Sequence, residues 1–412
     1  TTRRSARALR APREKFRSTF HGSACSKKQK RYCALLCHNT YMRAFIISTD
    51  ESAFQEGSET RARFESYGKV IGEVVYIVIS KHPHGNISVN RYITIVAAHG
   101  RWRIVALFRA YRIGSRMKEV EVVSAQDPFE QGFVGWLIAH RLKAGFHLQV
   151  HTDVGSSYFA SNIKNNIRFI IARFLLPRAD AIRTVSERVR TAVVRQFHAP
   201  LHRVSVLPIL HAREDTGEDP AALNLKEMFP RYDSFILVVS RLEEEKNVAL
   251  AIRAFSLIAK SHPKTGLLIL DDGREKEKLS ALAVSLGIDA QVQFVGFRSD
   301  ASRFFREANI YLLTSDYEGY GRTLMEAAYA GCPIVTTDTG LVGSVLTKEE
   351  ALICPPRDKK CIAGHLSLLL ENPKLGVYLA AAAKKAAERM LSATAEEYIL
   401  AYRDDLARAM QL

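Results

Sequence analysis

The sequence predicts an α/β protein built from two doubly wound, parallel-sheet domains. The chain has 412 residues, which is more than one ordinary hydrophobic core accommodates. Short, continuous apolar runs alternate with helix-forming stretches, a pattern typical of parallel strands that are buried on both faces. The alternation occurs twice, on either side of a polar, acidic stretch at 211–230 that suits a linker between domains.

The first alternation covers residues 42–210. In such a domain the ligand crevice lies at the carboxyl ends of the strands. The expected strands are 44–48, 74–80, 120–124, 146–151, 181–185 and 204–208, and the expected helices are 58–67, 101–112, 132–143 and 163–176.

The second alternation covers residues 231–390, and an Ala-rich, helix-forming stretch, 375–410, continues into the last segment, 391–412. The expected strands are 235–240, 266–270, 291–294, 310–314 and 333–336, and the expected helices are 247–260, 275–286 and 301–308.

The composition is that of an ordinary soluble protein, with 47% hydrophobic and 25% charged residues. No apolar run approaches the roughly 18 residues that a membrane-spanning helix needs. The net charge of +16 is unevenly placed, because residues 1–41 hold eleven Lys or Arg and one Glu. The remainder is only moderately basic.

The basic extension, residues 1–41, lacks periodic apolar patterning, and four interpretations compete for it. It is a disordered basic arm, a nucleic-acid-binding tail, a targeting peptide, or translated sequence upstream of the true start. The last is favoured, because Met42 is followed directly by an apolar strand, as at the start of many α/β enzymes. A targeting peptide is disfavoured, because no apolar segment follows the charges.

The six cysteines predict neither a metal site nor a disulfide framework. The motif Cys33-x3-Cys37-His38 lacks a second pair of ligands, which disfavours a structural zinc site. The cysteines beyond the extension are few and suit a reducing cytosol. They are Cys332, Cys354 and Cys361.

The stretch 315–335 carries the strongest functional signal. It opens on turn-forming residues, passes Gly319 and Gly321, and becomes a helix-forming run at 323–330. A glycine-containing loop that leads into a helix N-terminus is a ready anion site. Glu318 and Glu326 beside it suit the hydroxyls of a sugar nucleotide better than a bare phosphate. The alternative is a surface helix whose glutamate complements the helix dipole.

Glu318 and Glu326 frame seven residues, with Gly-Tyr-Gly after the first and Ala-Gly-Cys-Pro-Ile-Val after the second. This run resembles the Glu-x7-Glu signature of retaining glycosyltransferases of the GT-B fold, the large family 4 group in particular. The resemblance implies two Rossmann-like domains that face a cleft, and a last helix, 396–409, that returns to the first domain. It also implies a nucleotide-diphosphate sugar as donor.

The run 238–247 resembles the family's strand followed by Arg-Leu-x3-Lys-Asn, with Arg241 and Lys246 in the cationic positions. Negative charge gathers on the departing diphosphate, and a guanidinium and an ammonium placed there stabilise it as it develops. No Asp-x-Asp motif follows a strand. We therefore expect metal-independent transfer with no cofactor.

The resemblance also implies the remaining donor contacts. Glu326 accepts the ribose hydroxyls, Glu318 holds hydroxyls of the donor sugar, and the loop N–H groups meet the diphosphate. The turn at Asp271 resembles the family's Gly-x-Gly turn, with Asp271 in place of the first glycine. The candidate donor-binding residues are Glu326, Gly319, Tyr320, Gly321, Arg322, Thr323, Gly296, Phe297, Arg298, Asp272 and Gly273.

Four positions follow strands of the first domain and are candidates for the acceptor side: Gly57, Gln126, Asp127 and Asp153. Gly57 stands where relatives carry a glycine-rich loop. Asp127 and the proline after it could equally cap the next helix. His151 ends a strand where the family often places a sugar-contacting histidine, and it is a candidate catalytic residue.

The donor base, whether UDP, GDP or ADP, is left open by the sequence, as is the acceptor. We expect a glycan or lipid-linked acceptor in cell-envelope polysaccharide or glycolipid synthesis, a cytoplasmic protein, and no nucleic-acid partner. Helix 163–176 carries a basic flank suited to the inner face of the membrane, although its apolar residues are expected to face the core.

Three alternative functions remain at this stage. An epimerase or a phosphorylase of the same architecture is the nearest enzyme alternative. The basic extension suggests a nucleic-acid-binding protein. A catalytically silent sugar-nucleotide binder would need the diphosphate cations to be missing, and both are present.

Overall fold

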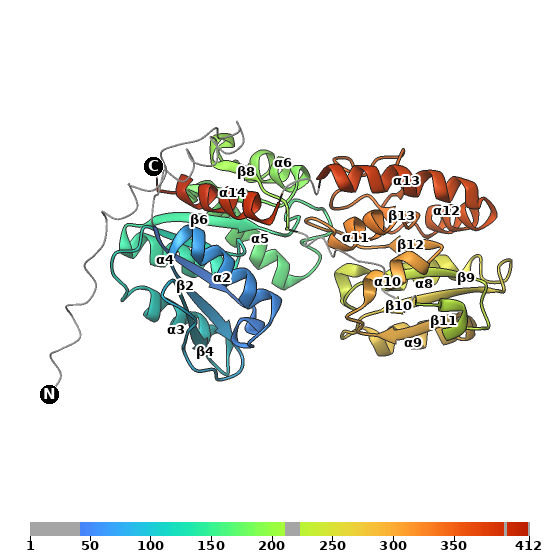
Figure 1. The fold of residues 1–412 in the computed structure, drawn as a ribbon, viewed down its shortest axis with the longest axis horizontal. Coiled ribbons are helices and arrows are strands. Elements are labelled where there is room, and N and C mark those ends of the chain that lie inside the picture. The colour runs from blue at the N-terminus through green and yellow to red at the C-terminus, as the bar shows by residue number, and fades with distance from the viewer. Residues whose placement is uncertain (1–41, 211–222, 391–393, 411–412) are drawn as a thin grey trace, which may run out of the picture. The chain divides into compact units, whose positions relative to one another are not determined.

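The computed structural model describes residues 42–210, 223–390 and 394–410. The prediction of two parallel-sheet domains is confirmed, because the described strands form an eight-stranded and a six-stranded sheet (Figure 1). The basic extension and residues 211–222 of the expected linker lie outside the described residues, and so do the predictions made for them.

The first sheet has the strand order β3-β4-β2-β1-β5-β6-β7-β8, and only the β3–β4 pair is antiparallel. Its strands are β1 (Met42–Ser48), β2 (Gly72–Ser80), β3 (Ile87–Ser88), β4 (Ile93–His99), β5 (Val122–Ala125), β6 (Gly145–Val150), β7 (Ala181–Thr184) and β8 (Val204–Val206). Its helices are α2 (Glu59–Ile71), α3 (Arg103–Gly114), α4 (Glu130–Leu142), α5 (Ile163–Leu175) and α6 (Glu187–Arg195).

Both faces of this sheet are buried, which explains the continuous apolar runs. Side chains of a strand alternate between faces. Phe45 and Ile47 of β1 therefore pack in the cluster that includes α3 and α4, whereas Ala44 and Ile46 pack with α2 and a C-terminal helix, α14 (Ala395–Arg408).

Two expectations for this region were wrong. Strand β4 was missed, because its Ala97 and Ala98 weaken the apolar β-branched signal of a buried strand. The first helix was expected to end at residue 67 but runs to Ile71. Gly68 does not end it, because this glycine allows close packing: a Cβ there would lie 2.3 Å from Cδ1 of Ile93.

The second sheet has the order β11-β10-β9-β12-β13-β14, with every neighbouring pair parallel. Its strands are β9 (Ser234–Val239), β10 (Thr265–Leu270), β11 (Val292–Gly296), β12 (Ile310–Leu313), β13 (Ile334–Thr337) and β14 (Leu352–Cys354). The helices are α7 (Leu225–Met228), which precedes the sheet, α8 (Val248–Ser256), α9 (Lys276–Ser285), α10 (Ala301–Glu307), α11 (Arg322–Ala330), α12 (Lys359–Glu371) and α13 (Pro373–Met390). Within the described residues, no helix has both the length and the apolar character required to traverse a bilayer.

Helix α14 packs on α2, β5 and β7 of the first sheet through a buried polar network. His147 Nε2 lies 3.0 Å from Oδ2 of Asp405, and Gln149 donates to the hydroxyl of Tyr402 at 3.0 Å. Burial alone would raise the pKa of Asp405, but the bonds from His147 and Ser205 outweigh it and lower the pKa to about 2. The network therefore favours a charged Asp405.

The cysteines also correct an expectation. Cys354, at the end of β14, and Cys361, in the first turn of α12, form a disulfide, although the sequence had suggested no such framework. A separation of seven residues gave no hint of it, because only the fold brings the strand end onto the helix start. Cys332 is a buried free thiol.

We predict that Asp405→Asn lowers the free energy of unfolding by about 2 kcal/mol at neutral pH, because it leaves His147 and Ser205 without their charged partner. Since the pKa of Asp405 is lower in the folded state, this stabilisation is present above the ordinary pKa of an aspartate. It is lost as the pH falls from about 4 to about 2. Urea unfolding at several pH values measures both effects.

The control is Glu388→Gln, which removes a charge from an exposed position on α13. It should change the stability by less than about 0.5 kcal/mol. Equal losses in the two variants would contradict the role assigned to Asp405.

Candidate active site

The predicted catalytic residues of the second domain, and the predicted donor-binding residue Glu326, lie at the carboxyl edge of its sheet. Arg241 follows β9, and Lys246 ends a short 3-10 turn in the same loop. Glu318 follows β12, and Glu326 lies in the second turn of α11. Because β9 and β12 are parallel neighbours, their following loops meet at one edge.

Lys246 and Glu318 are in direct contact. Nζ of Lys246 lies 2.6 Å from Oε1 of Glu318, and the two side chains are only 17% and 13% exposed. The hydroxyl of Ser315 donates to the same carboxylate oxygen at 2.8 Å. Two largely buried charges are thus held together and hydrogen-bonded, which is the condition under which such a pair is tolerated.

Arg241 and Glu326 have other partners. The Arg241 side chain is 65% exposed, and its guanidinium lies 3.4 Å from Oε1 of Glu245. Glu326 accepts from Nε of Arg322 at 2.7 Å. Burial, with smaller contributions from the charges of Glu318 and Glu326, raises the pKa of Tyr311.

The loop before α11 has the geometry of an anion site. Gly321 adopts a left-handed conformation, with φ of 83°, and no side chain caps the helix that begins at Arg322. Such an uncapped N-terminus offers backbone N–H groups and the positive end of the helix dipole to a ligand. Tyr320 is buried, and Thr323 accepts a hydrogen bond from the phenol of Tyr311 at 2.6 Å.

Of the two other predicted donor loops, one adjoins the loop of Arg241, and the second adjoins the first. A Cβ on Gly273 would lie 2.4 Å from the carbonyl oxygen of Leu242, so this turn packs directly on the residue after Arg241. The N–H of Asp271, a residue with φ of 86°, donates to the carbonyl of Gly296 at 2.8 Å.

Side chains in these loops are mostly engaged or turned to solvent. Asp272 lies 3.1 Å from Nζ of Lys276, and Arg298 forms two hydrogen bonds with Asp300. Phe297 is exposed. A nucleobase bound beside Gly296 would therefore contact backbone groups and the ring of Phe297. The cation next to them, Arg298, is already paired with Asp300.

His151 lies against the loop that carries Glu318. A Cβ on Gly319 would lie 1.9 Å from the carbonyl oxygen of His151, and the hydroxyl of Ser186 donates to the Gly319 carbonyl at 2.7 Å. Burial, together with the charges of Arg183 and Arg63, lowers the pKa of His151 to about 3. Its imidazole is therefore neutral at physiological pH, where it can bond a hydroxyl but cannot act as a cationic acid.

The other first-domain candidates are less closely connected to this point. Asp127 accepts from the N–H of Phe129 at 2.9 Å and from the side-chain amide of Gln131, the bonding of an Asx-type turn just before α4. Burial raises its pKa to about 6. Gln126 is half-buried, and Gly57 has φ of 77°, with no atom within 4 Å of the place that a Cβ would occupy.

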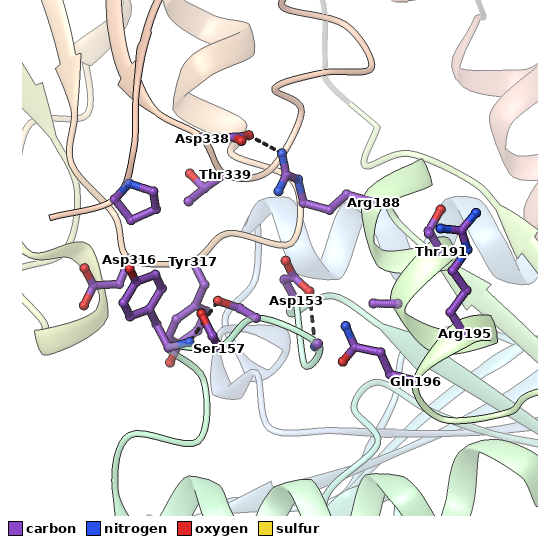
Figure 2. A pocket seen from close by; sticks show the side chains of 15 residues that line it. Asp153, Ser157, Arg188, Thr191, Arg195, Gln196, Asp316, Tyr317, Asp338 and Thr339 are labelled. Carbon is purple, nitrogen blue, oxygen red and sulfur yellow. Dashed lines mark hydrogen bonds and ion pairs between the residues drawn. The ribbon is translucent and has the colours of Figure 1, made fainter. Parts of the chain in front are cut away.

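Asp153 lines a cavity of about 410 Å³ (Figure 2). Asp316 and Tyr317, which directly precede Glu318, line it from the second domain, and Arg188 and Asp338 form an ion pair across it. The cavity is thus polar and borders the loop that leads into α11.

The sequence reasoning missed several of these residues. Asp316 stands inside the stretch already singled out, so its position after β12 was a usable signal. Arg357 bonds Asp316 from 41 residues away, and Arg188 pairs with Asp338 across 150 residues. Local sequence patterns do not reveal contacts between residues that are so far apart in the chain.

A further cluster lies beyond β1 and β2 of the first sheet. Nδ1 of His82 and Nε2 of His84 are each 3.0 Å from Oε2 of Glu51, and the ring of Phe54 stacks on His84. The run His82-Pro-His84 directly after the second strand was the signal that the sequence offered for it.

Comparison with known proteins shows what this chain is similar to. The model of the family described as "Glycosyl transferases group 1" matches residues 225–386, which include the candidate donor-binding residues. Glycogen synthase of Mycobacterium tuberculosis is 26% identical over 361 residues, covering 82% of this chain and 83% of that protein. Alpha-monoglucosyldiacylglycerol synthase of Acholeplasma laidlawii is 22% identical over 308 residues, covering 66% and 72%.

Solved structures share the fold. Sucrose-phosphate synthase from Thermosynechococcus elongatus matches with a TM-score of 0.70 at 17% identity, covering 89% of this chain and 98% of that one. Anabaena HepE in complex with UDP and glucose matches with a TM-score of 0.66 at 16% identity, covering 84% and 95%.

We predict that Gly319→Ala lowers both stability and activity. A methyl group would meet the His151 carbonyl, and relieving the clash costs about 1–3 kcal/mol. The φ of Gly319 is not left-handed, so backbone conformation contributes little. Thermal unfolding and a transfer assay measure the two effects.

Gly364→Ala is the matched control, because this exposed glycine lies inside α12 with no atom within 4 Å of the added methyl. It should stabilise the protein by roughly 0.5–1 kcal/mol. A Gly319→Ala variant as stable and as active as wild type would show that the loop does not press on His151.

Proposed function

We propose, from the premise that this chain belongs to the glycosyl transferases group 1, retaining nucleotide-sugar glycosyltransferases with the GT-B fold, that it transfers a hexose from a UDP-sugar to a glycan or lipid-linked acceptor. The predicted activity is confirmed at the level of the family. The UDP base and the acceptor class are our proposal. The base is supported by HepE and TarM, neighbours in fold whose structures contain UDP.

The observation that carries the donor assignment is the contact between Lys246 and Glu318 beside the uncapped start of α11. A carboxylate that accepts sugar hydroxyls and an ammonium that meets phosphate oxygens stand next to each other at this point. A ligand that has both groups, a sugar diphosphate, satisfies both.

The chemistry we propose follows from this arrangement. As the bond between the sugar and the diphosphate breaks, negative charge grows on the phosphate oxygens, where Lys246, Arg241 and the helix N-terminus stabilise it. Glu318 holds the sugar hydroxyls and Glu326 those of the ribose. The acceptor attacks from the face that the diphosphate leaves, and a departing phosphate oxygen takes its proton. No protein base is needed.

The acceptor would enter from the side of the first sheet. In this proposal neutral His151, whose backbone carbonyl lies against Gly319, bonds a hydroxyl of the transferred sugar. The cavity beside Asp153 has polar walls, and a hydroxylated acceptor fits such a surface better than an apolar chain does.

We predict that Glu326→Ala removes the preference for ribose, whereas Arg241→Ala mainly lowers kcat. Calorimetry with UDP and 2′-deoxy-UDP should show roughly tenfold or greater discrimination by wild type and little by Glu326→Ala. Arg241→Ala should lose about a hundredfold in kcat. Assays run in EDTA test the accompanying proposal that transfer needs no metal.

Glu277→Ala, at an exposed position on α9, is the control and should match wild type in both measurements. Tighter binding of GDP- or ADP-sugars would overturn the choice of base alone. Equal discrimination by wild type and Glu326→Ala would overturn the ribose contact, and activity lost in EDTA would overturn metal independence.

The first domain also presents surfaces suited to a lipid-linked acceptor. On α5, Ile163, Ile167 and Ile170 are 81%, 55% and 66% exposed, and the cations Lys164 and Arg173 are exposed beside them. The expectation that these apolar residues face the core was wrong for Ile167 and Ile170. The core-facing side of the helix is formed by other residues, with Leu175 fully buried.

Helix α3 has the same character, with exposed Trp102, Ile104 and Phe108 among the exposed cations Arg109 and Arg112. The two helices are linked at α4, because Glu130 lies 3.6 Å from Arg103 and 3.2 Å from Arg168. We call the exposed apolar and basic side chains of α3 and α5 the apolar–basic face. We propose that this face rests on anionic lipid at the cytoplasmic side of a membrane, since it supplies both the apolar and the cationic contacts that such a surface attracts.

We predict that replacing Ile163, Ile167 and Ile170 together with Ser weakens binding to phosphatidylglycerol vesicles by roughly tenfold or more. Sedimentation with vesicles measures it. The control variant, Leu257→Ser with Val284→Ser, removes exposed apolar side chains from helical regions of the second domain and should bind as wild type. Wild type that stays in the supernatant, or a triple variant that sediments equally well, would refute the proposal.

A further inference from the structure

The loop between β14 and α12 is closed by the Cys354–Cys361 disulfide, with the two Cα atoms 5.8 Å apart. The six residues between them, Pro-Pro-Arg-Asp-Lys-Lys, contain Arg357, which adopts a left-handed conformation with φ of 66°. A bulky residue in this conformation is uncommon and persists only where its surroundings hold it. The ring formed by the disulfide is one such restraint.

Arg357 reaches from this ring to the candidate active site. Its guanidinium donates three hydrogen bonds to Asp316, the shortest of 2.7 Å, and lies 4.5 Å from the ring centroid of Tyr158. Pro356, its neighbour, lines the cavity with Asp316 and Tyr158. The disulfide-closed loop is therefore part of the cavity wall.

Asp316 in turn joins the two loops that carry the proposed donor contacts. Its carboxylate accepts from the amide of Asn247 at 2.9 Å, and its N–H donates to the carbonyl of Glu245 at 2.9 Å. These residues flank Lys246 in sequence, and Asp316 precedes Glu318 by two positions. A continuous set of bonds thus runs from the disulfide to the Lys246–Glu318 pair.

The surroundings of the sulfur atoms suit reversible exchange. Cys354 is fully buried, but Cys361 is partly exposed in the first turn of α12, where the helix dipole favours a thiolate. Nδ1 of His365 lies 3.3 Å from Sγ of Cys354 and 3.9 Å from Sγ of Cys361. Burial lowers the pKa of His365, so a neutral imidazole is available to accept a thiol proton.

We propose that Cys354 and Cys361 form a reversible redox modification site, whose disulfide holds Arg357 on Asp316 and so tightens the donor site, and whose reduction loosens it. An external thiolate, from a small thiol or a protein dithiol, attacks Sγ of Cys361, and Cys354 leaves as a thiolate beside His365. A second thiolate then attacks the external sulfur of the mixed disulfide, which releases Cys361 as a thiolate. The external pair is oxidised to a disulfide, two electrons pass to the protein, and both protein thiolates gain protons.

The disulfide itself is tested by digestion with trypsin under non-reducing conditions. Trypsin cleaves after Arg357, Lys359 and Lys360, between the two cysteines. The peptides that contain Cys354 and Cys361 should stay joined in the oxidised protein and separate on reduction. Separate peptides from protein treated with oxidised glutathione would overturn the proposal.

The coupling to the site is tested by hydrogen exchange, which needs no activity. Reduction should increase exchange at 355–360 and at 315–318, and Cys361→Ser should exchange like the reduced wild type in either condition. The control is a variant with Cys25, Cys33 and Cys37 changed to Ser, which should keep the full response. Unchanged exchange at 315–318 on reduction would overturn the coupling.

The effect on function rests on the proposed donor, so it is measured last. Reduction should raise the KM for the UDP-sugar by roughly fivefold in wild type and leave Cys361→Ser unchanged. A redox response that persists in Cys361→Ser would overturn the proposal. If no UDP-sugar is a substrate, the exchange measurement still decides the inference, so the failure of the donor proposal and of this one are distinguishable.

Discussion

The contact between Lys246 and Glu318 is the interaction on which the candidate site depends. Each charge lies mostly out of water, which would be costly for either alone, and each comes from a different loop. The parallel pairing of β9 with β12 brings those loops to one edge of the sheet. The fold thus gives each buried charge an oppositely charged partner, which offsets the free-energy cost of its burial. The pair therefore compensates both charges within the protein and favours keeping the two loops together.

The loops of the second sheet are bonded to each other, and in the first sheet the loops that follow β1 and β2 are joined through Glu51. Asp316 bonds Asn247 and Arg357, and Gly273 packs on Leu242. On the first sheet, Asp50 accepts from Ser52, two positions on, and so Asx-type local bonds shape that loop. A shared set of bonds resists change at any one position, while local bonds let each loop vary.

Sequence reasoning succeeded where local pattern and structure coincide. Apolar runs buried on two faces predicted most strands of both sheets, though not β3, β4 or β14, and glycine with helix-forming residues predicted the loop and helix at 319–330. It failed at β4, where two alanines replaced β-branched residues, and at α5, where isoleucines at helical spacing turn outward. Arg357 and Arg188 were out of reach, because contacts between distant segments leave no periodic trace, and the disulfide was out of reach because only the fold brings the end of β14 onto the start of α12. The predicted roles of the site residues stay predictions, although the structure brings Lys246 and Glu318 together.

The position of α14 has a consequence for how this protein is made. The helix covers one face of the first sheet, yet its residues leave the ribosome after every strand of both sheets. During synthesis, the apolar side chains on that face, among them Ile46 and Tyr76, stay uncovered until α14 has been made. His147 likewise lacks its partner Asp405 until then. Apolar surface exposed in this way invites association with other nascent chains or capture by a chaperone. The first domain is therefore translated first, but it completes its folding only after the end of the chain has been made.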